Sequence, residues 1–280
     1  MRIGVRCHDV SHSNLEELSE SIQEKSLKSV HLALQKVKTG FDMKKSYITP
    51  GMAKHVRDIF AKHDTSIGIL GCYVNLAHPD DSELNVLLNK FKEHIRFARD
   101  FGCSLVGTET GALNKEYVYG PENNTEEAFL RTLNSVKILV KEAEKFGVIV
   151  AIEGVAKHVI NTPERMKRIL DNIDSNNLQV IFDPTNYMTA DNYKNQDETI
   201  IKKSFELFGD RIVAIHAKDF ICEDNEIKSA PIGKGLLNYE LLLSLVKENN
   251  PYIDIFLEET KPENVDDSID YITRMYESIK

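Results

Sequence analysis

Residues 148–155 read VIVAIEGV, a short apolar run, rich in β-branched side chains, that ends on a single acid, Glu153. Such a run predicts a strand that is buried on both faces, as in a parallel sheet. Seven other stretches have a similar form, so the sequence predicts eight strands. They cover residues 3–7, 29–34, 66–74, 104–111, 148–155, 178–186, 212–220 and 254–260.

Longer stretches with helical periodicity separate these runs. Apolar residues recur at three- and four-residue spacing between Phe129 and Ala143, which places them on one face of a helix. Residues that favour helix starts are Asn14, Pro50, Ser82, Thr125 and Pro163, and those that favour helix ends are Gly102 and Gly147. Eight repeats in 280 residues average about 35 residues each, enough for a strand and a crossover helix.

This alternation predicts an α/β protein with a single (β/α)8 TIM barrel, forming one domain over residues 1–280. Its active site is expected at the C-terminal ends of the strands. A doubly wound open sheet is the alternative, but no Gly-x-Gly-x-x-Gly motif follows the first predicted strand. The longest insertion, residues 114–124, is expected to be an active-site loop after the fourth strand.

The composition excludes several classes of protein. There are 44 acidic residues and 35 Lys or Arg, and the resulting net charge of −9 argues against nucleic acid as a partner. No apolar run is long enough to span a membrane, and no signal-peptide core follows Met1, so we expect a cytoplasmic protein. The four cysteines lie far apart without a Cys-x-x-Cys motif, which indicates reduced core residues.

The last four predicted strands each carry one polar residue after an apolar run. These residues are Glu153, Asp183, His216 and Glu258. At equivalent heights on adjacent strands they would converge, and three carboxylates with one imidazole form a site for a divalent cation. Manganese is the ion we expect, and magnesium, cobalt and zinc stay open. Each acid taken alone could instead cap a helix, and His216 alone could be a core histidine.

A cation at this point would allow a defined chemistry. It could hold two oxygens of a hydroxy-carbonyl substrate and acidify the neighbouring C–H bond, while a carboxylate of the site moves the proton.

Five motifs in a fixed order resemble the xylose isomerase-like barrel superfamily, the sugar phosphate isomerase and epimerase group. They are Ala151-Ile152-Glu153, Ile181-Phe182-Asp183-Pro184-Thr185-Asn186, Ile215-His216-Ala217-Lys218-Asp219, Pro231-Ile232-Gly233-Lys234-Gly235 and Leu257-Glu258. The resemblance implies one metal ion bound by Glu153, Asp183, His216 and Glu258. It also implies that Glu153 and Glu258 are the catalytic acid–base pair, acting on a sugar or polyol-derived substrate through a cis-enediolate. Relatives often form dimers or tetramers, so the resemblance leaves a homo-oligomer open.

Two departures from the family pattern bear on the substrate. Many relatives carry a substrate-contacting histidine three residues after the acid of the sixth strand, where this chain has Asn186. Several epimerases carry an arginine shortly after the histidine of the seventh strand, where this chain has Lys218 and Asp219. The substrate is therefore expected to be a sugar or polyol derivative, with a free ketohexose less favoured.

Four residues are candidates for substrate binding: Glu109, Asn186, Lys218 and His158. For three of them another interpretation stays open: Glu109 could cap a helix or brace a loop, Lys218 could pair with a neighbouring acid such as Asp219, and His158 could lie in solvent. The ends of the first and third predicted strands supply further residues that could line the pocket, namely Arg6, His8, Tyr73 and Asn75. The remaining histidines, including His31, show no pattern that assigns them a role.

Three other functions compete with an isomerase or epimerase. The first is a dehydratase or lyase of the same superfamily, of the inosose or dehydroshikimate type. The second is a sugar-binding barrel without catalysis. The third is a DNA-repair endonuclease, which the negative charge and the small number of strand-end histidines disfavour.

Overall fold

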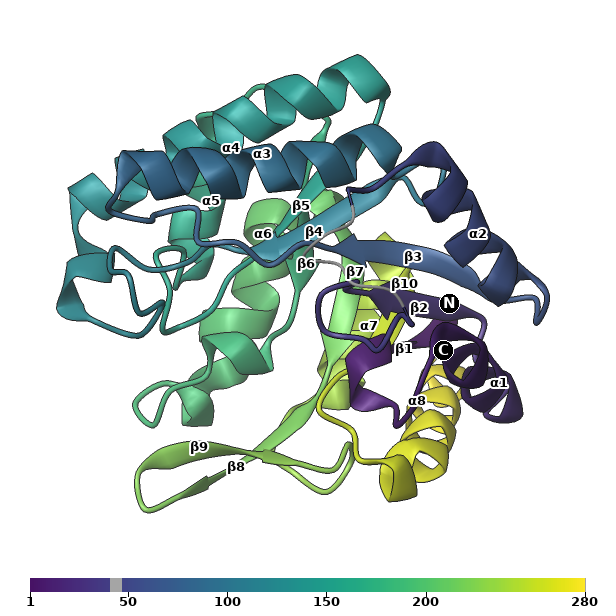
Figure 1. The fold of residues 1–280 in the computed structure, drawn as a ribbon. Helices are drawn as coiled ribbons and strands as arrows, with labels where there is room; N and C mark the ends of the chain where they lie inside the picture. The colour runs from purple at the N-terminus through teal and green to yellow at the C-terminus, as the bar shows by residue number, and fades with distance from the viewer. Residues whose placement is uncertain (41–46, 280) are drawn as a thin grey trace.

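The computed structural model describes residues 1–40 and 47–279. Eight parallel strands close into a barrel in the order β1-β10-β7-β6-β5-β4-β3-β2, so the predicted TIM barrel is confirmed (Figure 1). The strands of the barrel are β1 (Arg2–Arg6), β2 (Ser29–Leu32), β3 (Ser66–Gly71), β4 (Leu105–Glu109), β5 (Ile149–Glu153), β6 (Leu178–Phe182), β7 (Ile212–Ala217) and β10 (Asp254–Leu257). All eight predicted strands are present; the first begins one residue earlier with the predicted length, and the other seven are shorter than expected. That residues 1–280 form one domain stays a prediction.

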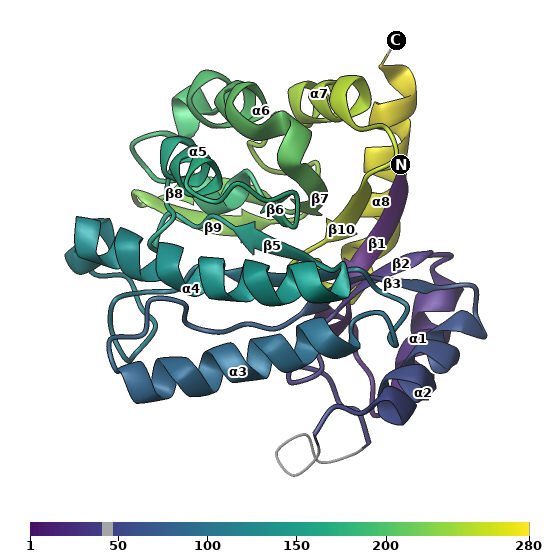
Figure 2. The same cartoon turned by 90° about the horizontal axis from the view of Figure 1, so that it is seen from above.

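Eight α-helices surround the strands (Figure 2). They are α1 (Leu15–Glu24), α2 (Pro50–Ala61), α3 (Asp81–Phe97), α4 (Glu126–Phe146), α5 (Pro163–Asp171), α6 (Lys203–Phe208), α7 (Tyr239–Asn249) and α8 (Val265–Ser278). Among the described residues, no helix has both the length and the hydropathy that crossing a membrane requires.

The ends of the helices mostly follow the local sequence signals. The side chains of Asn14 and Thr125 accept a backbone N–H in the first turn of α1 and α4, as predicted. Gly147 ends α4 with φ +59°, a left-handed conformation that favours glycine. Ser82 was expected to start α3, but this prediction is wrong, because Asp80 is the residue whose carboxylate accepts the N–H groups of Ser82 and Glu83.

A second, two-stranded sheet was not expected. Residues 212–220 were predicted as one strand, but β7 ends at Ala217 and an antiparallel hairpin follows, with β8 (Asp219–Glu223) and β9 (Glu226–Ala230). Asp224 and Asn225 both have positive φ, 52° and 62°, as a two-residue type I′ turn requires. Because this hairpin lies between β7 and α7, that connection, rather than the one after β4, is the longer insertion. Figure 1 shows the hairpin projecting from the C-terminal end of β7.

The closure of the barrel joins the two ends of the chain. β1 pairs with β10 in register from Arg2 with Asp254 to Val5 with Leu257. Figures 1 and 2 both show β1 beside α8, at the start and the end of the colour scale. The last strand therefore places the residue after it, Glu258, next to the end of β1.

Candidate metal and acid–base site

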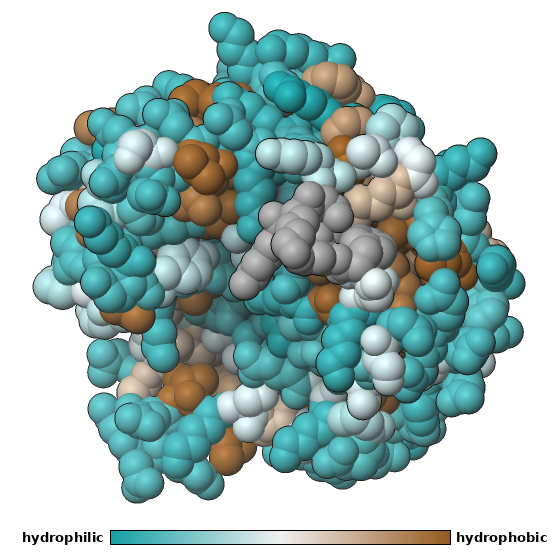
Figure 3. Space-filling view, viewed as in Figure 1, coloured by the Kyte–Doolittle hydropathy of each residue, from teal (hydrophilic) through white to brown (hydrophobic). Residues whose placement is uncertain are grey.

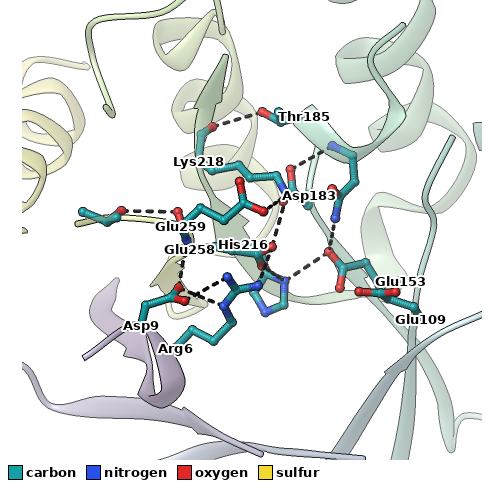
Figure 4. Close-up of polar contacts among 12 residues, drawn as sticks. Arg6, Asp9, Glu109, Glu153, Asp183, Thr185, His216, Lys218, Glu258 and Glu259 are labelled. Atoms are coloured by element: carbon teal, nitrogen blue, oxygen red, sulfur yellow. Dashed lines mark hydrogen bonds and ion pairs between the residues drawn. The ribbon is translucent and has the colours of Figure 1, made fainter. Parts of the chain in front are cut away.

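The four predicted metal ligands converge at the C-terminal end of the barrel. Glu153 ends β5, His216 lies near the end of β7, and Asp183 and Glu258 directly follow β6 and β10. All four side chains are buried, and one potential ligand atom of each lies within 4.8 Å of the others. Figure 4 shows them pointing toward one another, and Figure 3 shows a hollow with a largely hydrophilic floor on the face seen in Figure 1.

His216 lies between the two glutamates. Its Nδ1 atom is 3.1 Å from Glu153 Oε1 and 2.9 Å from Glu258 Oε2. Burial by itself would lower the pKa of His216, but the two carboxylates outweigh it and raise that pKa to about 10. In the protein without metal the imidazole is therefore protonated at neutral pH, and its positive charge offsets the charge of the two glutamates.

The cluster fits a divalent cation on chemical grounds. Three carboxylates and one imidazole form a donor set found with manganese, magnesium, cobalt or zinc. The Oδ2 atom of Asp183 is fully buried and accepts no hydrogen bond, although Lys218 Nζ lies 3.4 Å away. Burial raises the pKa of Asp183 to about 7, and the neighbouring carboxylates add to this effect, so the ionised site needs more positive charge than these residues supply.

Glu258 has strongly cationic surroundings. Its Oε1 atom lies 2.8 Å from Arg6 Nη1 and 3.1 Å from Lys218 Nζ. Burial would raise the pKa of Glu258, but Lys218, His216 and Arg6 together hold it well below the usual range. Glu258 therefore stays ionised.

Asp9 holds Arg6 in place. Arg6 donates from Nε and Nη2 to the two oxygens of Asp9, at 2.8 and 3.0 Å. The same carboxylate accepts the backbone N–H of Glu259 at 2.8 Å, and Glu259 has a positive φ of 51°. Asp9 thus fixes both the arginine and the backbone next to Glu258.

Glu153 has a different environment, in which a neutral amide accompanies His216. Asn186 donates from Nδ2 to Glu153 Oε1 at 2.8 Å, and its backbone N–H donates to Asp183 Oδ1 at 3.1 Å. Asn186, predicted to contact substrate, is thus placed at the cluster and bridges two of its acids.

Glu109 and His158 form a second group next to Glu153. Glu109 ends β4, pairs in register with Glu153, and accepts a hydrogen bond from Tyr117 at 3.2 Å. Its pKa is raised to about 7 by burial and by the charges of Glu153 and Glu258. His158 was expected either near the substrate or in solvent. The solvent alternative is wrong, because its side chain is 10% exposed and its Nδ1 lies 3.5 Å from Glu109 Oε2.

Lys218 pairs with acidic side chains, as its alternative expected, but Asp219 is not one of them. Lys218 Nζ contacts Asp183 and Glu258, as described above, whereas Asp219 accepts backbone N–H groups from the turn after β9. These come from Gly233 and Gly235, at 3.0 and 2.9 Å, and from Leu237 at 2.9 Å. Gly233 has φ +78°, and a Cβ on Gly235 would collide with Asp219, so the turn requires both glycines.

Three residues at the site had no signal in the sequence. His31, in β2, lies with Nδ1 3.0 Å from Nε2 of His216. Tyr117 and Asp9 were also not predicted. Tyr117 lies in a loop and contacts Glu109, and Asp9 contacts the backbone of Glu259, which is distant in sequence. Of the suggested pocket-lining residues, Arg6 contacts Glu258 directly, whereas Asn75 braces loops by accepting the backbone N–H groups of residues 77 and 112.

The comparisons with known proteins agree with this geometry. Residues 35–275 match the family model described as xylose isomerase-like TIM barrel. An uncharacterized protein of Methanocaldococcus jannaschii is 25% identical over 209 residues, which cover 72% of this chain and 67% of that protein.

Solved structures show the same fold. A D-tagatose 3-epimerase-like protein superposes with a TM-score of 0.78 at 19% identity, covering 99% of this chain and 97% of that one. The protein IolI, solved with a bound zinc atom, superposes with a TM-score of 0.74 at 17% identity, covering 98% and 96%. Other similar structures include further sugar epimerases and a probable 3-DHS dehydratase.

Proposed function

Because the chain belongs to the xylose isomerase-like TIM barrel family, we propose that it is a divalent-metal-dependent isomerase or epimerase of a small sugar or polyol derivative. The observation that carries the proposal is the convergence of Glu153, Asp183, His216 and Glu258, buried at the ends of four neighbouring strands. A cluster of three carboxylates in the interior is costly unless a cation compensates it, so the arrangement is better explained by binding than by packing.

The four residues would hold one divalent ion, and manganese is the ion we expect. When bound, the ion supplies Lewis-acid polarisation of a carbonyl and an adjacent hydroxyl group. His216 would provide its Nδ1 lone pair, the atom that already lies between the two glutamates.

Glu153 and Glu258 would move the proton. One glutamate removes the proton from the carbon next to the substrate carbonyl, and the electron pair is delocalised to give a cis-enediolate. Return of a proton to the opposite face of the same carbon gives the epimer, and return to the neighbouring carbon gives the isomer. Glu258 would enter the reaction as the carboxylate, because Arg6 and Lys218 hold it ionised.

We assign substrate contacts to Glu109, Asn186, Lys218 and His158. With a pKa raised to about 7, Glu109 can donate to or accept from a hydroxyl group of the substrate. His158 is neutral, because burial lowers its pKa to about 4, and its Nδ1 has no hydrogen-bond partner among the described residues. Lys218 would stabilise negative charge on the substrate oxygens next to Glu258.

A dehydratase is the second candidate, supported by the similarity of the fold to that of a probable 3-DHS dehydratase. It would use the same proton removal and then expel a hydroxyl group from the β-carbon. A cytoplasmic location and a homo-oligomeric state stay predictions.

Proton exchange tests the proposal directly. Metal-stripped protein is reloaded with manganese, magnesium, cobalt or zinc and incubated in deuterated water with a panel of ketoses, aldoses, their phosphates, inososes and dehydroshikimate. We expect one substrate to gain deuterium at carbon only with reloaded protein. The stripped protein and a double variant, Glu153→Gln with Glu258→Gln, are the controls.

The products separate the candidates. A product of unchanged composition, apart from deuterium, indicates an isomerase or epimerase, and one lighter by a water molecule indicates a dehydratase. Binding of a sugar without exchange, unaffected by Glu153→Gln, would contradict both and indicate a binding protein.

A further inference from the structure

We infer that His31 is a positioning residue that fixes the tautomer of His216 and thereby presents the Nδ1 lone pair of His216 to a metal ion. This inference rests on the proposed function, because it assumes that His216 is a ligand. It concerns a histidine of β2, a strand separated from β7 in the barrel by β10 and β1, to which the sequence assigns no role.

The two imidazole rings are packed against each other inside the barrel. His31 and His216 are 1% and 0% exposed, their ring centroids are 5.1 Å apart, and the interplanar angle is 17°. Tyr73 stacks on the other side of His31, with centroids 5.9 Å apart, and Phe256 meets both histidines edge-on. The ring of His31 is therefore confined by His216, Tyr73 and Phe256, and the ring of His216 by His31 and Phe256.

The space around His31 depends on Gly71 of β3. A Cβ atom at this position would lie 2.5 Å from His31 Nε2 and 3.2 Å from Cδ2 of the same ring. The backbone of β3 thus approaches the imidazole closely, which fixes the direction of its Nδ1 atom toward β7.

The hydrogen bond between the rings determines which nitrogen of His216 can bind a cation. Nδ1 of His31 is 3.0 Å from Nε2 of His216, and no other group contacts this Nε2 atom among the described residues. A neutral imidazole has one N–H group and one lone pair. If Nδ1 of His216 binds metal, its Nε2 carries the proton and must donate it to His31 Nδ1.

Without His31, that N–H group would be buried with no acceptor. An unsatisfied donor in the interior costs free energy, and metal ligands that lose such a partner typically bind metal about 10- to 100-fold more weakly. Most ligand histidines donate to a carboxylate, a backbone carbonyl or water. Here the acceptor is a second imidazole, neutral when it accepts, so it adds no further negative charge to a site already rich in carboxylates.

Two variants separate the hydrogen bond from the ring. His31→Phe keeps an aromatic ring in the stack and removes the acceptor. His31→Asn loses the ring but places an amide oxygen near the position of Nδ1. The matched control is His94→Phe, which replaces another buried histidine, in α3, whose contacts are the carbonyl of Lys90 at 2.9 Å and Gln35 at 3.3 Å.

The measurements are zinc affinity by competition with a chromophoric chelator, and long-range ¹H–¹⁵N spectra of the zinc-loaded wild-type protein. We expect His31→Phe to weaken zinc binding about 10- to 100-fold. His31→Asn should restore most of the affinity, and His94→Phe should leave it unchanged. The spectra should show His216 protonated at Nε2 and not at Nδ1.

The possible results show separately whether the inference or the proposed function fails. Equal affinities of wild type and His31→Phe would overturn the role of His31 and leave the metal site standing. A proton on Nδ1 of His216 in the zinc-loaded wild type would show that this atom is not a ligand, and would overturn the inference together with the proposed role of His216. A wild-type protein that binds no divalent ion would overturn the proposed function, and the inference with it. Because the spectra need only the wild type, the inference stays testable even where a variant fails to fold.

Discussion

The two glutamates of the proposed acid–base pair lie on the same cluster but in contrasting surroundings. On the β10 side, Arg6 and Lys218 both contact Glu258, which is held ionised. On the β5 side, Glu153 accepts a hydrogen bond from the neutral amide of Asn186 and lies beside Glu109, whose pKa is raised to about 7. The barrel thus provides one carboxylate, Glu258, that resists protonation, and places beside Glu153 another, Glu109, that takes up a proton near neutral pH.

This difference suggests that the two faces of a substrate would meet unequal groups. General acid–base catalysis is most effective where the pKa of the group lies near the working pH. Glu109, beside Glu153, meets this condition with a pKa of about 7, whereas Glu258 is held ionised by its cations. The following predictions test whether the asymmetry is real.

The largest effect is expected on turnover. Glu153→Gln and Glu258→Gln should each lower the turnover of the epimer pair by about 100- to 10,000-fold, because each removes a proton carrier. Deuterium exchange should separate them: each variant should still exchange the epimer whose proton the remaining glutamate removes. Complete loss of exchange with both epimers in only one variant would show that a single glutamate serves both faces.

The second effect concerns the free energy of unfolding without metal. Glu258→Gln leaves Arg6 and Lys218 with less countercharge in the interior and should destabilise the protein by about 3 kcal/mol. Glu153→Gln loses contacts with a neutral partner and His216, and should cost about 1 kcal/mol. Urea unfolding in the presence of a chelator measures both, and equal losses would contradict the contrast between the two sides.

A pair of arginines on one strand offers the third test. Arg6 contacts Glu258 at the site, and Arg2 forms an ion pair with Asp254 at the opposite end of the same two strands. Arg6→Met should lower kcat/KM about 10- to 100-fold, in line with the loss of a charged hydrogen bond. Arg2→Met, the matched control, should change kcat/KM less than about threefold because its ion pair is partly exposed. Similar effects of both changes would indicate that strand pairing, rather than the charge on Glu258, is responsible.

A fourth test is the pH dependence of metal binding. In the protein without metal, the pKa of His216 is raised to about 10 and that of Asp183 to about 7. Both groups must lose their protons to become ligands, so protons compete with the metal and affinity should rise with pH. We expect about a tenfold increase per pH unit for each proton released, with two protons below pH 7 and one above it. Calorimetry between pH 6 and pH 9, in buffers of different ionisation enthalpy, counts these protons, and a flat profile would contradict the assignment.

The sequence predicts the strands and the ligand cluster because each signal is local. Apolar runs that end on Glu153, Asp183, His216 and Glu258 specify four strand ends, and a barrel brings those ends together. What surrounds the cluster depends on contacts across the barrel. Arg6 is separated by most of the chain from Glu258, and only the pairing of β1 with β10 makes them neighbours.

Other features could not be predicted because they depend on packing or on a turn. His158 is buried by a loop that brings Tyr117 against it, and no pattern in residues 114–124 indicates that contact. The Asp224-Asn225 pair is compatible with a hairpin turn. The prediction nevertheless extended the seventh strand to residue 220, which left no residues for the start of a separate β8 at Asp219. His31 lies in an apolar run, and the sequence around it does not distinguish a histidine that only packs in the core from one that positions a ligand.

The contact between Arg6 and Glu258 also links activity to the order in which the chain folds. One partner belongs to the first strand and the other follows the last, so their ion pair forms only when the ring closes. Contacts between such distant parts of a chain carry the largest loop-closure entropy and slow down folding. During synthesis, a nascent chain holds Arg6 and Asp9 long before Glu258 leaves the ribosome. The ion pair that keeps Glu258 ionised therefore depends on closure of the ring, so a barrel that has not closed lacks this contact.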